Sequence, residues 1–580
     1  MPANYLSLPL ALFLVASAAA APSVTMITNA PITISSPGSY RLANDINWTG
    51  TGTNNAIAIT ISANDVSLDL NGKSLTGDQY YGLDIFTALG IVASKATNVT
   101  IFNGTVNGFR SGGVVLDTVN SVKLYNLSIK NINNLGLWSG LYTTNTVFGL
   151  LATGSTNVMI SNVVVQNINL QSTNNKTALA EVGGIFAIGC ANFTNVNVSI
   201  SSVSDNCGVA EGIGIIDTLG TTILKSTISD ISTGEGATSN LVGHTCLGMV
   251  FSPTRLSCNI TGATVTSGGS GYSGYPLVTI SAVTNDAGSN GYGYAQVSPS
   301  GQVTNVIVTG IGTNYETFPN VTIAGPGTGA EAVVQPNQVS YTTIGYCGNI
   351  RVEDCSISNI TGAIDDAHGI SLFTVTNAVI RRTHVNGVTD GANAYGFGGS
   401  KATGFENYGN PVPTNCNITV EDCFAENITA IGPADLTANG FSAAGNGIRF
   451  IRCRAANVQV SGTNRLDPLA SPGVAAGFGW APDVRVQNLY PARNTTIEGC
   501  TVTGTPVCFD TYNFQNSLWR NNRGVVIPNG IRYLQEPIAT SRTIFGSLWN
   551  EVCDAELYPD GIKAIPIYNT AQGNTILPAP

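Results

Sequence analysis

Charged residues are scarce in this 580-residue chain. Only 10% of its residues are Asp, Glu, Lys or Arg, against about 25% in an average globular domain. The net charge of −10 argues against nonspecific binding to nucleic acid, because a phosphate backbone repels an acidic protein. Low charge together with low hydrophobicity would have suggested disorder, but 43% apolar residues in regular alternation indicate a packed core.

Apolar runs long enough to cross a membrane are lacking as well. The run from Leu6 to Val15 is too short to span a bilayer as a helix, and it leads into the small residues Ala16 to Ala21. This order is typical of a secretory signal peptide, although no Lys or Arg precedes the run. We therefore expect residues 1–21 to be a signal peptide and the mature protein to be secreted, without an integral membrane segment.

Cysteine and histidine are sparse, with twelve Cys, three His and no spacing typical of a zinc site. Four cysteines share one place in the repeat described next: Cys355, Cys423, Cys453 and Cys500. Equivalent positions in neighbouring coils of a parallel solenoid lie about 4.8 Å apart, with side chains pointing the same way. This favours a buried column of thiols, with disulfides between coils as the alternative.

The chain is rich in one repeated pattern. In Val420–Ile428, apolar residues stand at the first, sixth and ninth places, and the sixth is small. A repeat of about 25–40 residues with strand-like alternation indicates a solenoid, because one coil cannot bury its own apolar side and coils must stack. Further copies of the pattern begin at Ile101, Leu124, Ile160, Ile223, Val352, Ile380, Phe450 and Ile497.

A second predicted strand precedes the first in each coil and opens with glycine. A short turn follows it, often with Asn, as at Asn98 and Asn377, because Asn tolerates left-handed backbone angles and its amide can pair with the next coil. The glycines that open these strands are Gly90, Gly113, Gly149, Gly184, Gly214, Gly369, Gly396, Gly440 and Gly477.

Two stretches near the start carry a resemblance to a known family. Pro37–Leu42 and Val66–Gly77, which read PGSYRL and VSLDLNGKSLTG, resemble the opening of right-handed parallel β-helix proteins of the pectin-lyase-like superfamily. The resemblance covers most of the chain and implies an all-β, right-handed parallel β-helix. It implies no single function, since that fold hosts lyases, hydrolases, tailspikes, adhesins and structural proteins.

The rhythm is interrupted by residues 259–337, which contain an internal duplication of Val265–Ile280 in Val308–Ile323. This segment resembles Gly-Tyr β repeats of phage and large-virus structural proteins, and we interpret it as a small inserted β domain. The expected division is residues 22–258 as the N-terminal part of the β-helix with its cap, and residues 338–536 as its C-terminal part. Residues 537–580 are the predicted C-terminal cap or tail.

One acidic cluster attracts a catalytic interpretation. Asp365, Asp366 and His368 resemble the Asp-Asp and Gly-His-Gly elements of polygalacturonase-type β-helix hydrolases, but the Asn-Thr-Asp and Arg-x-Lys elements of that family are not recognisable. The alternative is ordinary turn chemistry, because Asp is common before glycine in turns.

Basic residues follow about one coil later. In pectate-lyase-like enzymes, which this sequence resembles in fold, an Arg or Lys abstracts the proton next to a uronate carboxylate with the help of Ca²⁺. Arg381, Arg382 and Lys401 are the candidates for that role, and the alternative is that the arginines are solvated surface residues.

Carboxylates also recur before the glycine-opened strands. Glu181 and Glu211 each stand three residues before one of these glycines, as Asp366 does, and Asp390 and Asp435 lie near equivalent places. Stacked carboxylates about 5 Å apart repel one another, which raises a pKa or recruits a cation such as Ca²⁺. We therefore treat this set as a candidate ligand-binding column.

The insert offers aromatic side chains on a glycine-rich frame, among them Tyr272, Tyr275 and Tyr315. Flat aromatic surfaces stack sugar rings, so these tyrosines are candidate glycan contacts. The alternative is that they pack the core of the insert itself.

Asn-x-Ser/Thr sequons are frequent. They indicate either a glycosylated surface or only an Asn- and Thr-rich composition. The sequon asparagines are Asn47, Asn98, Asn103, Asn126, Asn175, Asn192, Asn197, Asn259, Asn320, Asn359, Asn417, Asn427 and Asn494.

Two functions remain open at this point. The first is an exported or virion-surface protein with a structural or attachment role, binding a polysaccharide or cell-surface glycan and compatible with a homotrimer. The second is a polysaccharide lyase or glycoside hydrolase acting on acidic polysaccharide. A hydrolase needs two carboxyl groups about 5–9.5 Å apart on one groove, so separation of the acidic and basic groups would remove its basis.

Overall fold

The computed structural model describes most of the chain between residues 23 and 553. The described ranges are 23–49, 56–77, 88–134, 145–170, 180–206, 209–234, 246–252, 255–260, 262–281, 291–310, 319–334, 339–344, 347–362, 366–373, 375–391, 393–401, 417–431, 437–443, 445–461, 475–480, 492–510, 514–515, 517–534, 546–549 and 552–553. The predicted signal peptide and most of the predicted C-terminal cap therefore lie outside the described residues.

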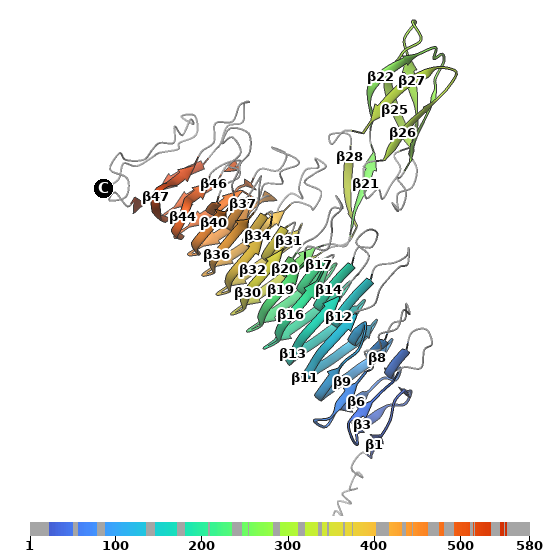
Figure 1. The fold of residues 1–580 in the computed structure, drawn as a ribbon, viewed down its shortest axis with the longest axis vertical. Helices are drawn as coiled ribbons and strands as arrows, with labels where there is room; N and C mark the ends of the chain where they lie inside the picture. Colours follow the sequence, from blue (N-terminus) through green and yellow to red (C-terminus); the bar gives the residue numbers. More distant parts are fainter. Residues whose placement is uncertain are drawn as a thin grey trace, which may run out of the picture.

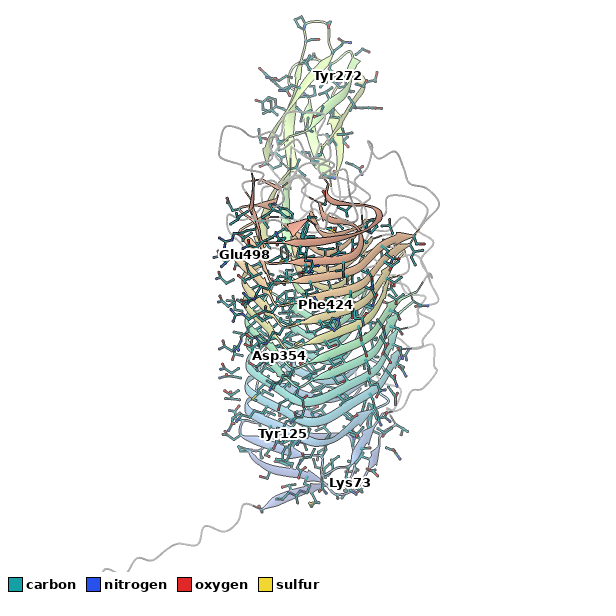
Figure 2. The ribbon with its side chains drawn as sticks, turned by 90° about the vertical axis from the view of Figure 1, so that its left-hand side faces the viewer. Lys73, Tyr125, Tyr272, Asp354, Phe424 and Glu498 are labelled. Atoms are coloured by element: carbon teal, nitrogen blue, oxygen red, sulfur yellow. The ribbon has the colours of Figure 1, made fainter. Side chains whose placement is uncertain are left out.

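Within these residues, 38 strands join in one hydrogen-bonded sheet whose strand pairs are all parallel. A typical coil contains β14 (Ala180–Ile188), β15 (Ala191–Val196) and β16 (Ser199–Asp205). Each pairs with its counterpart in the next coil: β17 (Val209–Ile216), β18 (Leu219–Leu224) and β19 (Thr227–Thr233). The three strand series form three faces of one long stack, which Figures 1 and 2 show from two sides. The chain is thus an all-β parallel β-helix, right-handed as such crossovers are.

Face 1 consists of β2 (Ile32–Ile34), β5 (Ala56–Ile61), β8 (Ala88–Ser94), β10 (Gly112–Asp117), β12 (Asn145–Thr153), β14, β17, β20 (Cys246–Ser252), β31 (Asp366–Phe373), β34 (Asn393–Lys401), β37 (Thr437–Ala443) and β41 (Ala475–Trp480). Face 2 consists of β1 (Val24–Ile27), β3 (Gly38–Leu42), β6 (Val66–Asp69), β15, β18, β29 (Gly348–Glu353), β32 (Thr376–Arg381), β35 (Ile418–Glu421), β39 (Ile448–Ile451), β43 (Thr496–Glu498), β46 (Ser517–Arg520) and β48 (Gly546–Trp549). Face 3 consists of β4 (Ile46–Asn47), β7 (Ser74–Thr76), β16, β19, β30 (Ser356–Gly362), β33 (His384–Asp390), β36 (Phe424–Ile431), β40 (Arg454–Ser461) and β49 (Val552–Cys553). The long strands β9 (Thr97–Asn107), β11 (Asn120–Asn134) and β13 (Thr156–Leu170) bend from face 2 into face 3, and β44 (Thr501–Asp510) and β47 (Arg523–Leu534) continue from face 3 towards face 1.

The repeat found in the sequence is the core of this stack. Its first apolar place forms one continuous column on face 2, in which Ile160 pairs through Asn195 with Ile223, and so on to Ile497. The column members are 0–2% exposed, so the predicted solenoid core is confirmed. Asn195 is the exception, since its amide is fully buried and makes no hydrogen bond within the described residues.

The glycines of face 1 also stack, because the interior is narrow there. A Cβ on Gly149 would come within 2.3 Å of the Val165 side chain, and one on Gly184 within 2.5 Å of Ile200. Side chains from face 3 therefore fill the space that a face-1 side chain would need. In the coil after Gly184 the stacked residue is Gly212, and the prediction of Gly214, two residues further on, was wrong.

The insert leaves the stack between β20 on face 1 and β29 on face 2 of one coil. β21 (Arg255–Ile260) and β28 (Val339–Ile344) form an antiparallel two-stranded stalk, which carries the insert away from the coils (Figure 1). Beyond it lie β22 (Thr264–Ser270) with β27 (Thr328–Val333), and a four-stranded antiparallel sheet in the order β25-β24-β23-β26. The strands of that sheet are β23 (Leu277–Ser281), β24 (Gly291–Val297), β25 (Val303–Gly310) and β26 (Asn320–Ala324). The insert has its own apolar core, so the predicted inserted β unit is present.

A separate parallel sheet joins β38 (Gly445–Asn446), β42 (Ala492–Arg493) and β45 (Phe514–Gln515).

Asparagine ladders line the turns, as predicted. Asn98 and Asn377 have φ values of 57° and 55°, in the left-handed region. Asn162 donates its side-chain N–H to Asn126 at 3.3 Å and accepts one from Asn197 at 2.7 Å. Seven sequon asparagines donate in this way to the previous coil, which favours composition as the reason for the sequons, while glycosylation stays a prediction. These seven are Asn98, Asn126, Asn192, Asn197, Asn359, Asn417 and Asn427.

The four repeat cysteines occupy one corner column between faces 2 and 3 and are free, buried thiols. Cys355 donates to the carbonyl of Glu353 at 3.2 Å and to that of Ile223, one coil earlier, at 3.7 Å. Ser226 and Thr383, its neighbours above and below, donate to the equivalent carbonyl of their own coil. A thiol serves here as a small corner donor. The prediction of buried, free thiols is confirmed for these four residues, but Thr383 separates Cys355 from the three that stack on one another.

Asn162→Ala is expected to lower the free energy of unfolding by about 2 kcal/mol. It removes two ladder hydrogen bonds, and it places alanine, which tolerates left-handed backbone angles less well than asparagine, at a φ of 52°. Asn162→Gly removes the hydrogen bonds but accepts the backbone angle, so its loss should be smaller. Urea unfolding followed by circular dichroism measures both. Equal losses in the two variants would contradict the backbone part of this explanation.

Burial raises the pKa of the Cys355 thiol to about 11. The folded protein is therefore expected to hold this thiol protonated and unreactive towards a disulfide reagent at pH 8, and to expose it only on unfolding. Thiol titration with and without urea measures this. The Cys355→Ser variant should fold normally, and the number of reactive thiols per unfolded chain should fall by one. Rapid reaction of Cys355 in the native protein would contradict the buried corner.

Candidate functional site

The predicted catalytic residues lie at different corners of the coil. Asp366 and His368 are in the first half of β31 on face 1, whereas Arg381 ends β32 on face 2 and Arg382 follows it. β33 then returns along face 3 for seven residues, a length of about 20 Å, and ends at Asp390 close to the start of face 1. The acidic and basic groups are thus on different faces and do not form one site.

Several predicted residues are described only in part. Lys401 ends β34 and is the register partner of Phe373, at the end of face 1 remote from His368. For Lys401 and Asp366 the structure describes the backbone alone. Asp365, Asp435 and Tyr315 lie outside the described residues.

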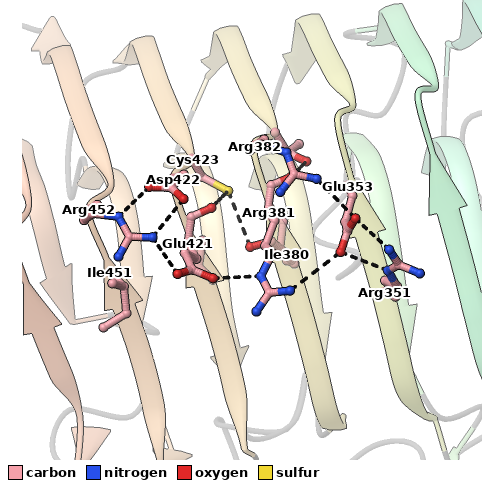
Figure 3. A network of polar contacts seen from close by, with 12 residues as sticks. Arg351, Glu353, Ile380, Arg381, Arg382, Glu421, Asp422, Cys423, Ile451 and Arg452 are labelled. Carbon is pink, nitrogen blue, oxygen red and sulfur yellow. Dashed lines mark hydrogen bonds and ion pairs between the residues drawn. The ribbon is translucent and has the colours of Figure 1, made fainter.

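Arg381 and Arg382 are engaged in a ladder of ion pairs that crosses several coils (Figure 3). Arg381 contacts Glu421 at 2.7 Å, and its second nitrogen lies 3.9 Å from Glu353. Arg382 contacts Glu353 at 3.2 Å and Asp354 at 2.6 Å. Three guanidinium groups, counting Arg351, cover Glu353 so that only 8% of its side chain is exposed.

The charges along this corner alternate from coil to coil. The turn column after face 2 reads Lys225, Asp354, Arg382, Asp422 and Arg452 in five successive coils. Hydrogen bonds from Arg382 lower the pKa of Asp354, and those from Arg452 lower the pKa of Asp422. Arg382 and Arg452 are therefore each neutralised by carboxylates of a neighbouring coil. This placement argues for a structural role of the arginines rather than for capture of a uronate.

Glu181 and Glu211 do lie on one side of face 1, but not in the predicted register. Glu181 pairs with Val209, and Glu211 pairs with Gly183, two residues further along the strand. The discrepancy follows from the choice of Gly214 in place of Gly212. Through Leu247, Glu211 shares a column with His368, which is 1% exposed.

Glu211 is a buried carboxyl group in apolar surroundings. It is 5% exposed, and its Oε2 makes no hydrogen bond within the described residues. That oxygen lies over Gly214 beside the Phe186 ring, part of an apolar cluster on the outer side of face 1. Burial raises the pKa of Glu211 well above its ordinary value, and the charge of Glu181 raises it further. Burial raises the pKa of Glu181 as well. A carboxyl group with a raised pKa keeps its proton to a higher pH than an exposed one, and in that form it can donate a proton or a hydrogen bond.

Asp390 has a different environment. It is fully buried at the corner between faces 3 and 1, where its Oδ1 and the Cβ of Ala367 both approach Gly362. Its charge is one of the causes, after burial, that raise the pKa of Cys246. Asp390 therefore belongs to the interior of the solenoid and not to the outer side that carries Glu181 and Glu211.

The insert tyrosines divide between core and surface. Tyr272 is 5% exposed in the core of the insert, and its hydroxyl oxygen accepts the N–H of Ala330 at 3.4 Å. Tyr275 is 76% exposed. Leu277 and Tyr292, which were not among the predicted site residues, are 58% and 59% exposed. The signal for them was the alternation in β23 and β24, where Val278 and Ile280 point inward and their neighbours outward.

The described residues contain no group of three or more His, Cys, Asp or Glu placed to hold a metal ion, so Ca²⁺ binding stays a prediction. No helix suited to crossing a membrane occurs among them.

Comparisons with solved structures find matches of low sequence identity. No family model and no curated protein matches it. The Dettilon tailspike protein is 10% identical with a TM-score of 0.34, over 83% of this chain and 60% of its own length. The tailspike of E. coli bacteriophage HK620, solved in complex with pentasaccharide, is 9% identical with a TM-score of 0.34, over 89% of this chain and 72% of that one. The A-module of mannuronan C-5 epimerase AlgE6 from Azotobacter vinelandii is 11% identical with a TM-score of 0.30, over 90% of both chains. This chain thus spans about 60% of the length of the Dettilon protein. The class, a parallel β-helix with an inserted β unit, follows from the strand pairing itself.

Glu211→Gln is expected to raise the melting temperature at pH 7. The pKa of Glu211 is higher in the folded than in the unfolded protein. The contribution of Glu211 to the free energy of unfolding is therefore fully present below about pH 4, and it is lost as the pH rises through the folded-state pKa. Glutamine stays neutral and avoids that loss. The matched control is Glu353→Gln, whose carboxylate has a pKa lowered by Arg351 and which should destabilise the protein at pH 7. Thermal melts at pH 4 and pH 7 decide, and equal shifts for the two variants would contradict the assignment.

Proposed function

We propose that this protein is an exported or virion-surface attachment protein, in which the β-helix is a stiff shaft and the insert contacts glycans. The observation that carries the proposal is the position of the exposed apolar side chains. Among the described residues, the three most exposed large ones are Tyr275, Tyr292 and Leu277, and all belong to the insert beyond the stalk. A surface of this kind, held clear of the shaft, is suited to contact a partner.

The shaft supports the same proposal. Each coil is tied to the next by backbone pairing, by asparagine ladders and, at one corner, by alternating ion pairs. Such a body keeps the insert at a fixed distance from the far end of the solenoid. Two of the predicted catalytic cations, Arg381 and Arg382, are already bound to carboxylates of neighbouring coils.

A second function, cleavage of acidic polysaccharide, is favoured by one observation. Glu181 and Glu211 lie on the same side of face 1 with raised pKa values, the condition in which a carboxyl group acts as a general acid near neutral pH. This pair replaces the Asp366 and Arg381 set as the basis of an enzymatic hypothesis.

The purified full chain is expected to bind glycans on an array or on cells without cleaving them. Binding and product release are measured against acidic and neutral polysaccharides, with and without Ca²⁺, and light scattering tests for the homotrimer. Cleavage that is abolished by Glu211→Gln but kept in Asp366→Asn would establish the second function instead. Failure both to bind and to cleave would reject both functions.

A further inference from the structure

The outer side of the four-stranded sheet in the insert is an aromatic surface without charge. In β23, Val278 and Ile280 point into the core and are fully buried, so Leu277 and Thr279 point outward. Across the β23–β24 pairing, Leu277 faces Tyr294 and Thr279 faces Tyr292. Both tyrosines therefore share the outer side with Leu277.

The rings on this surface are fixed by their neighbours. Tyr275 and Tyr294 meet edge to face, with ring centroids 5.4 Å apart and an interplanar angle of 86°. The Tyr292 ring lies over Gly310 in β25, where a Cβ would come within 2.4 Å of it. One side of the Tyr292 ring thus rests on backbone, while 59% of the residue stays exposed. Tyr275 is the most exposed large apolar residue of the described chain.

Polar side chains on the same sheet are amides and hydroxyls. Asn305 donates to Gln296 at 3.1 Å, which holds the two amides side by side, two residues beyond Tyr294. Thr322 pairs with Thr279 across β23 and β26. The four strands contain no Asp, Glu, Lys or Arg. A ligand that fits this surface is uncharged, offers flat C–H faces to the rings and carries many hydroxyl groups for the amides and threonines.

We infer that this surface, defined by Tyr275, Leu277, Tyr292 and Tyr294, binds an uncharged oligosaccharide. The inference rests on the proposed attachment function and names the contact site and the ligand class within it. A charged glycan would find no counter-charge on these strands. A protein partner would be expected to meet an apolar centre with a polar rim, whereas here amides and hydroxyls are interleaved with the rings.

The test measures binding of the full chain to neutral and acidic oligosaccharides at low and high salt. The protein is made in a host without N-glycosylation, because Asn320 on the adjacent β26 begins an Asn-Val-Thr sequon. Tyr275→Ala and Tyr292→Ala should each weaken binding of a neutral oligosaccharide about tenfold or more, and Tyr292→Phe should keep most of it. The matched control is Val333→Ser, which changes a 42% exposed apolar residue of the insert outside this sheet and should leave binding unchanged.

The possible outcomes distinguish failure of the proposed oligosaccharide site from failure of the proposed attachment function. Neutral-glycan binding that is insensitive to salt and lost in both alanine variants supports the inference. Glycan binding that both alanine variants retain, or that is restricted to acidic glycans and falls with salt, overturns the inference and leaves the attachment function standing. Loss of self-association in the alanine variants, without an effect on glycans, overturns it in favour of a second copy of this chain. Absence of any glycan binding by the unaltered chain removes the attachment function itself.

Discussion

Parallel stacking of coils is the constraint on which the rest of this structure depends. A side chain at one place of a coil lies about 4.8 Å from its equivalent in the next coil and points the same way. A group repeated on successive coils must therefore tolerate its own kind as a neighbour. Apolar side chains, amides and thiols do so, and they form the Ile160 column, the Asn162 ladder and the adjacent thiols of Cys423 and Cys453. Like charges do not, so the charged corner alternates in sign.

The sequence predicted the parts of the molecule that obey this constraint. The apolar columns, the turn asparagines and the equivalent cysteines were all identifiable, because each repeats in the chain at the spacing at which it stacks in space. Even the insert was recognisable as a break in the rhythm. Asn195 was not predicted as buried, because the single polar member of an apolar column has no local signal that marks it.

The candidate site was harder to predict, since it depends on register and on which side of a strand a residue occupies. Two glycines lie close together in Gly212-Ile213-Gly214, and choosing the second moved Glu211 by two residues. Arg381 and His368 are only thirteen positions apart, yet a corner and most of two strands separate them. The ion pairs of Arg381 join coils 28 and 40 positions away, contacts for which a single sequence gives no direct signal.

The alternating corner also restricts how this chain can change in length. Removal or duplication of one coil within the column from Lys225 to Arg452 would bring two groups of the same sign into contact, because the order is positive, negative, positive, negative, positive. A change of two coils restores the alternation. The apolar columns have no such parity and accept any whole number of coils. Growth by duplication is therefore expected to proceed in pairs of coils along this segment and in single coils elsewhere. The charged corner thus sets the smallest number of coils by which its part of the shaft can lengthen or shorten.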